Sequence, residues 1–359
     1  MASQILVAMS GGVDSAVAAW LLQKKGYEVV GATMCLGVPE AVSKRPVCCG
    51  VAAINDARSV CEKLHLRHFV LDFSRELEKF VIKKFVEEYC RGRTPNPCVD
   101  CNTFLKFKFL FEKARALGFD FLATGHYVRL VKKGAVPFLK KARDLKKDQS
   151  YFLYGIKKKV LPKLLFPLGN LVKEEVREIA RKEKLPVANK TESQDICFIP
   201  SGNREKIILS KIKNIKKGLI VNRQGEILGE HRGLAFYTVG QRAGLGISWR
   251  YPLYVIKIDA PKNQLVVGEK KDLLQKTLVA GELNWFVNKI PQSALAKIRY
   301  SHALSGCRMR PMKEGSGKIK VVFSEPQPAA TPGQAIVFYN KSGLVLGGGV
   351  IEEVLDEYC

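Results

Sequence analysis

A short loop near the start of the chain has the composition of a phosphate-binding site. The sequence SGGVDS at 10–15 follows an apolar run at 5–9 and opens a helical pattern at 14–25. Backbone N–H groups at the first turn of a helix bind anions, and glycines let the backbone approach them closely. The Asp14 carboxylate can hold a magnesium ion or position a water on a phosphate. The loop therefore predicts a phosphate-bearing ligand, although a plain strand-to-helix turn would use similar residues.

Three cysteines lie in polar segments, where sulfur or metal chemistry is a more natural role than packing. Cys98 and Cys101 form a CxxC pair in TPNPCVDCN, which we expect to be a loop held open by prolines that cannot lie inside a helix. Cys197 follows much later, in SQDICF. Ten cysteines in an intracellular chain indicate metal binding or catalysis rather than a disulfide framework. Four others are expected to be buried as small apolar side chains, namely Cys35, Cys61, Cys90 and Cys307.

The elements that must position these residues alternate between strand and helix. Apolar runs predict strands at 5–9, 29–33, 69–72 and 121–124. Amphipathic segments predict helices at 14–25, 52–64, 76–90, 104–117 and 174–182. Such alternation predicts an α/β domain with a parallel sheet and helices on its faces. Open sheets of this kind bind ligands at the carboxyl ends of their strands, which is where the 10–15 loop lies.

The pattern changes beyond residue 200 to short β-rich runs separated by turn residues, such as GLIVNRQGEILG and PLYVIKID. We therefore predict three domains. The first, at 1–200, is the parallel-sheet nucleotide-binding and catalytic domain. A small β-rich central domain at 201–278 and a C-terminal β-barrel at 279–359 follow it.

The charge of the chain favours a polyanionic partner. Lys and Arg number 59 and Asp and Glu number 34, which gives a formal charge of +25. Such an excess attracts nucleic acid, although a solvated lysine surface would produce the same count. No apolar run approaches the roughly 20 residues of a membrane helix, and the N-terminus does not resemble a signal peptide. We expect a cytoplasmic protein with no membrane partner.

The 10–15 loop resembles the signature of the N-type ATP pyrophosphatases, and the chain has no Walker A motif and no dinucleotide fingerprint. That group cleaves ATP between its α and β phosphates to adenylate an oxygen of the substrate. The resemblance implies ATP and Mg²⁺ as cofactors, with Asp14 at the reacting phosphates. The implied ATP-binding residues are Ala8, Met9, Ser10, Gly11, Gly12, Val13, Asp14, Ser15, Met34 and Gly125.

A longer series of motifs resembles one family, the tRNA-specific 2-thiouridylases. The motifs occur in order as SGGVDS, TPNPCVDCN, ATGHY, KDQSYFL, SQDICFIPSG, GLAFYTVGQRAGLGI and TPGQAIVFYN followed by LGGGVI. The resemblance implies ATP-dependent 2-thiolation of the wobble uridine, position 34, in tRNAs for Glu, Gln and Lys. It also implies a persulfide or sulfide donor protein, such as a cysteine desulfurase or a sulfur relay protein.

The resemblance leaves two sulfur-transfer mechanisms open. In the first, the residue matching Cys197 carries a persulfide, and the residue matching Cys101 is the nucleophile that frees its sulfur by forming a disulfide. In the second, Cys98 stands where many members have Asp, and Cys98, Cys101 and Cys197 hold a 4Fe-4S cluster with one iron open to the transferred sulfur. The pair Cys48 and Cys49 has no assigned role.

The resemblance also implies where tRNA binds. Asn96, Pro97 and Cys98 match positions that contact the target base, which must leave its stack before C2 can be reached. Other matches to tRNA-contacting positions are His126, Lys147, Asp148, Gln149, Arg299, Tyr300 and Gln334. An arginine beside an aromatic residue, as at 299–300, can bind a phosphate and stack a base.

Two rival functions share part of this pattern. An amide-forming ATP pyrophosphatase that acts on a small molecule would have the same loop but would need no cysteine. A basic RNA-binding protein with a vestigial loop would bind tRNA and release neither AMP nor pyrophosphate. The cysteines separate the first rival from sulfur transfer, and the ATP chemistry separates the second.

Overall fold

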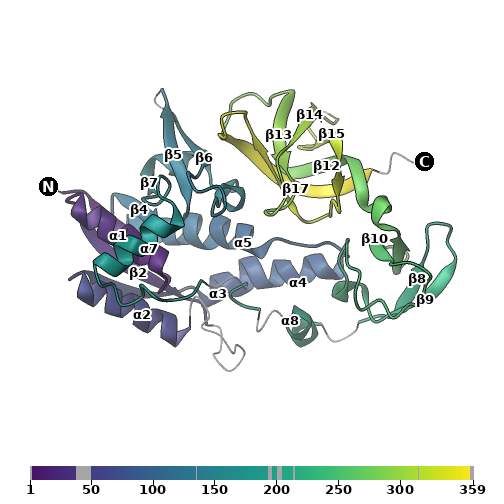
Figure 1. Ribbon diagram of the computed structural model, residues 1–359, viewed down its shortest axis with the longest axis horizontal. Helices are drawn as coiled ribbons and strands as arrows, with labels where there is room; N and C mark the ends of the chain where they lie inside the picture. Colours follow the sequence, from purple (N-terminus) through teal and green to yellow (C-terminus); the bar gives the residue numbers. More distant parts are fainter. Residues whose placement is uncertain are drawn as a thin grey trace. The chain divides into compact units, whose positions relative to one another are not determined.

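The computed structural model describes residues 2–37, 50–134, 136–192, 196–199, 204–212, 215–313 and 315–355 (Figure 1). Two compact units make up the chain. The first consists of residues 1–81, 98–204 and 343–345, and the second of 82–97, 205–342 and 346–359.

A five-stranded sheet forms the centre of the first unit, in the order β3-β2-β1-β4-β7. Every neighbouring pair of these strands is parallel. The strands are β1 (Gln4–Ala8), β2 (Glu28–Cys35), β3 (Arg67–Asp72), β4 (Phe121–Thr124) and β7 (Leu164–Leu165). The chain runs outward from β1 to β2 and β3 and then returns to β4 on the other side of β1. The predicted α/β class is confirmed, and the point where strand order reverses lies between β1 and β4, where such sheets bind ligands.

Three helices pack against this sheet around one apolar core. They are α1 (Val13–Lys24), α2 (Val51–Lys63) and α7 (Lys173–Lys182). Side chains of β1, such as Ile5 and Val7, share that core with Val17 of α1 and Val176 of α7. Figure 1 shows α1 and α7 side by side. Burial on this scale, at about 25 cal/mol per Å² of apolar surface, fixes where α1 and α7 begin relative to the strand ends.

The cysteine pair lies on a helix and not in the loop predicted from its prolines. Helix α5 (Pro97–Asp100) starts at the second proline and continues without a break through the π-helix η3 (Cys101–Leu110) into α6 (Phe111–Ala116). Proline is well tolerated at the first helical position, because its missing N–H would have no partner there and its fixed φ suits a helix. The prediction was wrong because only the interior of a helix excludes proline.

The remaining elements of the first unit are short. They are α3 (Ser74–Leu77), the antiparallel hairpin β5 (Val128–Lys133) and β6 (Val136–Lys141), and the 3₁₀ helices η4 (Ser150–Leu153) and η5 (Lys158–Lys163). A π-helix, η2 (Glu78–Ile82), continues α3 into α4 (Lys83–Cys90), so the predicted helix at 76–90 is one rod of mixed geometry.

The second unit contains two β structures. A four-stranded sheet has the order β10-β11-β8-β9, from β8 (Gly218–Val221), β9 (Ile227–His231), β10 (Tyr254–Asp259) and β11 (Gln264–Gly268). A closed barrel has the order β12-β15-β14-β13-β16-β17. Its strands are β12 (Leu274–Trp285), β13 (Ser293–Lys297), β14 (Ser305–Pro311), β15 (Ile319–Pro328), β16 (Ala335–Tyr339) and β17 (Val345–Leu355). The predicted C-terminal barrel is confirmed. The short elements α8 (Arg204–Lys211), η7 (Leu234–Phe236) and η8 (Lys270–Leu273) precede or join these strands.

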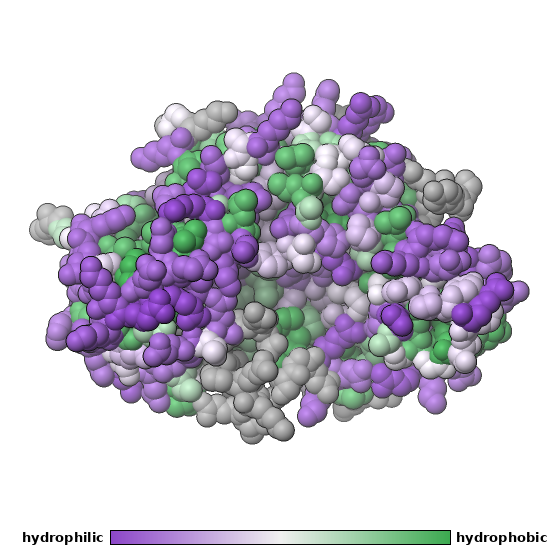
Figure 2. Space-filling model, in the orientation of Figure 1, coloured by the Kyte–Doolittle hydropathy of each residue, from purple (hydrophilic) through white to green (hydrophobic). Residues whose placement is uncertain are grey.

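Polar side chains dominate the visible surface. Figure 2 shows hydrophilic residues over most of the face that it draws, in keeping with the 59 Lys and Arg residues of the sequence. Among the described residues, no helix is both long and apolar enough to cross a membrane.

Candidate active site

The loop between β1 and α1 presents the start of α1 without a side-chain cap. Gly12 precedes the helix in an extended conformation and makes no side-chain capping bond. The Ser15 hydroxyl donates to the Gly12 carbonyl at 3.0 Å and accepts the Ser10 N–H at 3.2 Å, which closes the loop on itself. Gly11 has φ +68°, and a Cβ there would lie 2.3 Å from the Ala53 carbonyl oxygen. The loop is therefore held tightly while the first N–H groups of α1 are open to an anion.

Gly125 brings the end of β4 against the same loop. A Cβ on Gly125 would lie 2.8 Å from both the Asp14 carbonyl carbon and the Ser15 backbone nitrogen. Only a residue without a side chain fits, because real Cβ atoms do not approach backbone so closely. The sequence prediction that Gly125 belongs to the nucleotide site therefore has a structural basis, which is close approach of two backbones at the switch point.

We expect Gly125→Ala to weaken ATP binding by at least about tenfold, since the new methyl group must push the start of α1 away from β4. Isothermal titration with a non-hydrolysable ATP analogue measures the change. Gly229→Ala is the control, because the nearest atom to a Cβ there is an Ile247 side-chain carbon at 3.8 Å. Equal ATP affinity for Gly125→Ala and the unaltered protein would contradict this reading.

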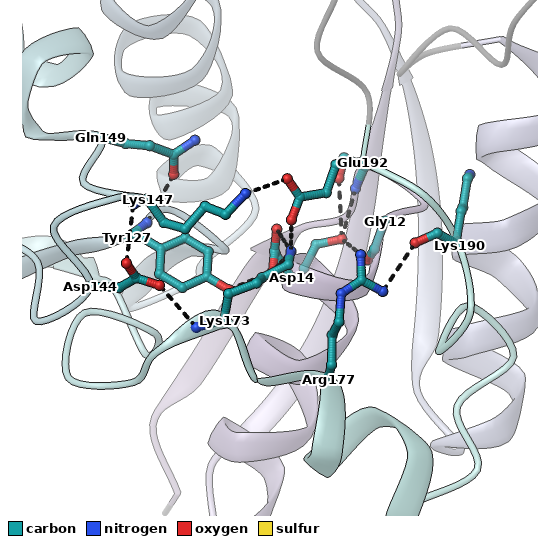
Figure 3. Close-up of polar contacts among 12 residues, drawn as sticks. Gly12, Asp14, Tyr127, Asp144, Lys147, Gln149, Lys173, Arg177, Lys190 and Glu192 are labelled. Carbon is teal, nitrogen blue, oxygen red and sulfur yellow. Dashed lines mark hydrogen bonds and ion pairs between the residues drawn. The ribbon is translucent and has the colours of Figure 1, made fainter. Parts of the chain in front are cut away.

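A buried lysine holds the carboxylate of Asp14. Lys173 Nζ lies 2.7 Å and 2.8 Å from the two carboxylate oxygens of Asp14, and the Lys173 side chain is only 6% exposed (Figure 3). The Tyr127 hydroxyl donates to Asp14 Oδ1 at 2.8 Å. Burial and the Asp14 charge raise the pKa of Tyr127, so the phenol stays protonated. Asp14 thus faces two fixed donors, and a metal ion at this carboxylate would have to compete with Lys173.

Glu192 joins the same cluster from the segment that leads to Cys197. Its carboxylate lies 2.8 Å from Lys173 Nζ and 2.6 Å from Lys147 Nζ. Partial burial raises the pKa of Glu192, but the hydrogen bonds and charges of the two lysines outweigh it and hold that pKa at about 2. The result is a series of alternating charges, Asp14, Lys173, Glu192 and Lys147, which connects the start of α1 with the start of α7 and with the turn before η4.

Asp144 fixes the backbone positions of Lys147 and Lys173. One of its oxygens accepts the N–H groups of Lys146 and Lys147, and the other accepts the Lys173 N–H at 3.1 Å. Glu175 accepts the Val172 N–H at 2.8 Å, which caps the start of α7 from inside the helix. Because Lys173 is the first residue of α7, this capping fixes the position from which its side chain reaches Asp14.

The stability that Glu192 contributes depends on pH in a defined direction. Its folded pKa of about 2 lies below the ordinary 4.5, so the contribution is present above pH 4.5 and is lost as pH falls toward 2. We expect Glu192→Gln to lower the thermal midpoint at pH 7 and to differ less from the unaltered protein at pH 3. Thermal unfolding at both pH values measures this. The exposed Glu178→Gln on α7 serves as the control, and a gap that stays constant with pH would contradict the assignment.

Lys190 supports the loop from its other side. Its ammonium donates to the Gly11 carbonyl at 2.9 Å and forms an ion pair with Asp56 of α2. Arg177 of α7 approaches the Lys190 carbonyl at 3.5 Å, the outer limit of a hydrogen bond. Lys190 thus links the Gly11 carbonyl to α2. The Ala53 carbonyl of α2 also packs against Gly11 and leaves no room for a side chain there.

Cys98 and Cys101 lie in the first turns of the helix that starts at Pro97. Residues three apart on a helix share a face, so the two thiols are neighbours on one side of it. Cys98 is exposed, and Cys101 and Cys197 are half-buried. Cys61 and Cys307 are buried as predicted, and burial raises the pKa of each thiol to about 12.

Two of the cysteines expected to be buried are not. Cys90 is exposed at the last position of α4, and Cys35 is half-buried. The prediction for Cys90 was wrong because the end of α4 turns that position to solvent. Cys48 and Cys49 lie outside the described residues, as do Ser193, Gln194 and Asp195 of the segment around Cys197.

The cysteines form no site for a single metal ion. Within the described part of the chain, no three His, Cys, Asp or Glu side chains come close enough together to hold one ion. A 4Fe-4S cluster is larger than one ion and binds each thiolate through a different iron, so a cluster at Cys98, Cys101 and Cys197 stays a prediction. Mg²⁺ is a different case, because it takes few protein ligands and several from substrate phosphates.

The residues of the first unit predicted to contact tRNA divide by burial. Asp148 is 4% exposed, and its carboxylate accepts the Ala142 N–H at 2.9 Å and the Ser150 hydroxyl at 2.9 Å. Gln149 exchanges bonds with the Tyr127 backbone, accepting its N–H through Oε1 and donating its own N–H to the Tyr127 carbonyl, both at 2.9 Å. Gln149 therefore positions Tyr127, and Asp148 holds the loop that contains Lys147. Contact of either residue with tRNA stays a prediction.

His126 is also buried, and its environment fixes its protonation. Nδ1 lies 2.7 Å from the Thr124 hydroxyl, and Nε2 lies 3.5 Å from Lys106 Nζ. Burial, followed by the nearby Lys106 charge, lowers the pKa of His126 well below its usual range. Because an ammonium only donates, Nε2 accepts and Nδ1 carries the proton.

In the second unit, Gln334 is bonded to the segment that carries Asn96 and Pro97. Its side-chain amide donates to the carbonyls of Thr94 at 2.9 Å and Pro95 at 3.2 Å, so Gln334 fixes the backbone just before Asn96 and Pro97. The Arg299 guanidinium donates to the Ala329 carbonyl at 3.0 Å and the Thr331 hydroxyl at 2.8 Å, and is half-buried. Tyr300 is 38% exposed.

Several residues of the site carry no distinctive sequence signal. Lys173 belongs to a lysine- and glutamate-rich stretch, and Lys190 and Glu192 belong to the polar segment NKTES. Both segments look like a solvated face, and sequence reasoning missed the three residues. Tyr127 could have been found, because it belongs to the ATGHY segment that follows β4. Met34 is the last but one residue of β2 and is buried, which fits packing as well as contact with an adenine.

Three family models match the chain in order along its length. The model described as tRNA methyl transferase HUP domain matches residues 3–201. The tRNA methyl transferase PRC-barrel domain matches 206–269, and the Aminomethyltransferase beta-barrel domain matches 275–351.

Curated relatives match nearly the full length. The chain is 53% identical over 352 residues to tRNA-specific 2-thiouridylase MnmA 1 of Syntrophus aciditrophicus, covering 98% of this chain and 93% of that protein. It is 46% identical over 362 residues to tRNA-specific 2-thiouridylase MnmA of Carboxydothermus hydrogenoformans, covering 98% of each. Identity to tRNA-specific 2-thiouridylase MnmA 1 of Clostridium botulinum is 43% over 359 residues, covering 98% of this chain and 100% of that protein.

Proposed function

Since the chain belongs to the tRNA-specific 2-thiouridylase family, we propose that it replaces the C2 oxygen of the wobble uridine of tRNA with sulfur, using ATP and two cysteines. The structural observation that carries the proposal is the composition of the first unit. It contains the anion-binding start of α1 together with Cys98, Cys101 and Cys197, so one compact body holds the groups for both half-reactions.

The first half-reaction is adenylation of the uracil. The C2 oxygen attacks the α-phosphorus of ATP, pyrophosphate leaves, and the oxygen becomes part of an AMP leaving group. The open N–H groups of α1 and the glycine loop bind the phosphates. Lys173 stabilises the negative charge that develops there, since it is the buried cation nearest the loop carboxylate. Mg²⁺ bound to the phosphates would supply further charge neutralisation.

The second half-reaction moves sulfur. A donor protein leaves a persulfide on Cys197. The Cys101 thiolate attacks the inner sulfur of that persulfide, so a Cys101–Cys197 disulfide forms and hydrosulfide leaves. Hydrosulfide then adds to C2, AMP departs with the original oxygen, and the carbon–sulfur double bond forms. A thiol reductant resets the disulfide with two electrons.

The position of Cys101 supports its role as the attacking group. Cys101 opens the π-helix directly after α5 and lies one turn along the same helix from Cys98. It is half-buried, so the thiol is partly accessible, as reactive cysteines are. These steps use the cysteine thiols alone, and a 4Fe-4S cluster held by Cys98, Cys101 and Cys197 stays the alternative.

The proposal is tested with an unmodified tRNA transcript, ATP and a persulfide donor. We expect 2-thiouridine in the digested tRNA, together with AMP and pyrophosphate in amounts equal to the thiolated uridine. A transcript with cytidine at position 34 is the matched control and should give none of the three products. An amide-forming pyrophosphatase or a non-enzymatic RNA-binding protein would leave both transcripts unmodified.

A further inference from the structure

The central domain carries a hollow that the sulfur chemistry does not use. It is formed by one stretch of chain, from Arg242 to Leu253, which leads from η7 into β10. Its volume is about 670 Å³, within the range of about 300–1,000 Å³ that is usual for small-molecule pockets. The hollow therefore has room for one nucleotide.

Backbone hydrogen bonds connect the two ends of this stretch. Gly240 N–H donates to the Val255 carbonyl at 2.8 Å, and Val255 N–H donates to the Gln241 carbonyl at 2.9 Å, which closes its base. Leu245 and Leu253 are buried. Gly244 and Gly246 have φ of +76° and +68°, so the chain turns where few other residues could.

The hollow presents an aromatic surface to solvent. The Trp249 side chain lies at its wall and is 40% exposed. Tyr251 meets it edge-on, with the ring centres 6.3 Å apart. A tryptophan left this open is common at binding sites, because its large flat face gains much when covered.

The charge of the hollow is positive. Arg242 and Arg250 line it, and no acidic residue does. The Arg250 guanidinium lies over the Tyr251 ring at 5.3 Å from its centre, which holds it beside the aromatic wall. Over the described residues, neither arginine forms an ion pair with a carboxylate.

A smaller hollow of about 400 Å³, which also has Trp249 in its lining, gives an internal comparison. Its basic residues are already neutralised, since Arg223 pairs with Asp272 at 2.8 Å and Lys271 pairs with Glu269 at 3.1 Å. Of the two hollows that share Trp249, only the larger one combines an open aromatic face with unneutralised cations. That combination suits a base on the ring and a phosphate on the arginines.

We propose that this hollow is a second tRNA subsite, which stacks one unpaired nucleotide on Trp249 and holds its phosphate with Arg242 and Arg250. The proposal rests on tRNA being the substrate. The subsite makes no contact with the reacting uracil, so it contributes to tRNA affinity and not to the chemical step. A protein partner such as a sulfur donor is the competing occupant.

The test measures steady-state thiolation and tRNA binding for Trp249→Ala and Trp249→Phe. We expect Trp249→Ala to raise the KM for tRNA about tenfold with kcat and the KM for ATP unchanged, in line with the loss of one stacked base. Trp249→Phe should recover most of the affinity. Ile227→Ala, which removes a 65% exposed side chain from β9 outside the hollow, is the control and should change nothing.

The arginines give an independent measurement. Arg242→Gln and Arg250→Gln should each reduce the slope of log affinity against log salt concentration by about 1 or less, which is the value for the loss of one phosphate contact. Unchanged tRNA binding in all of these variants would overturn the subsite, as would a rise in the KM for the persulfide donor alone. The two proposals fail in different measurements. If the unaltered protein does not thiolate tRNA, the proposed function is wrong, whereas the subsite is tested by the tRNA binding of the variants.

Discussion

Replacing Cys197 or Cys101 with serine is expected to lower 2-thiouridine formation at least a thousandfold while tRNA-dependent pyrophosphate release continues. Serine cannot carry a persulfide or form the disulfide, and removing a nucleophile costs as much as about 10⁶-fold in other enzymes. Adenylation needs neither thiol, because it uses only the uracil oxygen and ATP. Nucleoside analysis by mass spectrometry measures the first product, and a coupled pyrophosphate assay measures the second.

Cys90→Ser is the control for this experiment. Cys90 is exposed at the end of α4 and belongs to the second unit, so the substitution removes an exposed thiol that is not part of the first unit. It should retain full thiolation. An enzyme that still thiolates tRNA with serine at 101 or 197 would contradict the sulfur-transfer mechanism and favour chemistry that needs no cysteine.

Replacing Lys173 with alanine should have the second large effect, on both stability and adenylation. Asp14 and Glu192 would lose the cation between them, leaving two partly buried carboxylates close together. Breaking a buried ion pair costs about 3–5 kcal/mol, and we expect about 2–3 here because the carboxylates are partly exposed. Pyrophosphate release should fall at least about a hundredfold, since the buried cation that lies against Asp14 of the phosphate-binding loop is gone.

Lys182→Ala is the matched control, because Lys182 is the exposed last residue of the same helix. It should change neither the thermal midpoint nor pyrophosphate release. Measuring release well below the midpoint of Lys173→Ala separates the two effects. A Lys173→Ala protein that adenylates tRNA at the normal rate would remove Lys173 from the ATP site.

The sequence predicts the nucleotide loop well because its signal is local. A buried strand, two glycines and a helix start are consecutive, and the strand order then places Gly125 opposite them. The family predicted from the motifs is confirmed by identity over nearly the full length. The proline-rich segment shows how a local rule fails, because a proline at a first helical position starts the helix that it would break elsewhere.

The charged cluster could not be predicted in the same way. Lys173 is 159 residues from Asp14, and only the packing of α7 against α1 brings them together. In sequence, Lys173 is one more lysine in a basic chain. What distinguishes it is burial at 6% side-chain exposure and the capping of α7 by Asp144, and neither is visible without the fold.

The predicted tRNA contacts show a further limit. Arg299 and Asp148 have side chains already bonded within the protein, Arg299 to the 329–331 turn and Asp148 to the start of η4. A motif can mark a residue that holds the binding surface in shape as readily as one that contacts RNA. Their role in tRNA binding therefore stays a prediction.

The most direct test of the central claim follows one sulfur atom through a single turnover. The protein is loaded with a ³⁵S persulfide on Cys197, freed of donor, and mixed with unmodified tRNA and ATP without reductant. The account predicts that the label appears in 2-thiouridine at position 34 and that an equal amount of Cys101–Cys197 disulfide forms, detected in peptide digests. Labelled tRNA with both cysteines still reduced would contradict it.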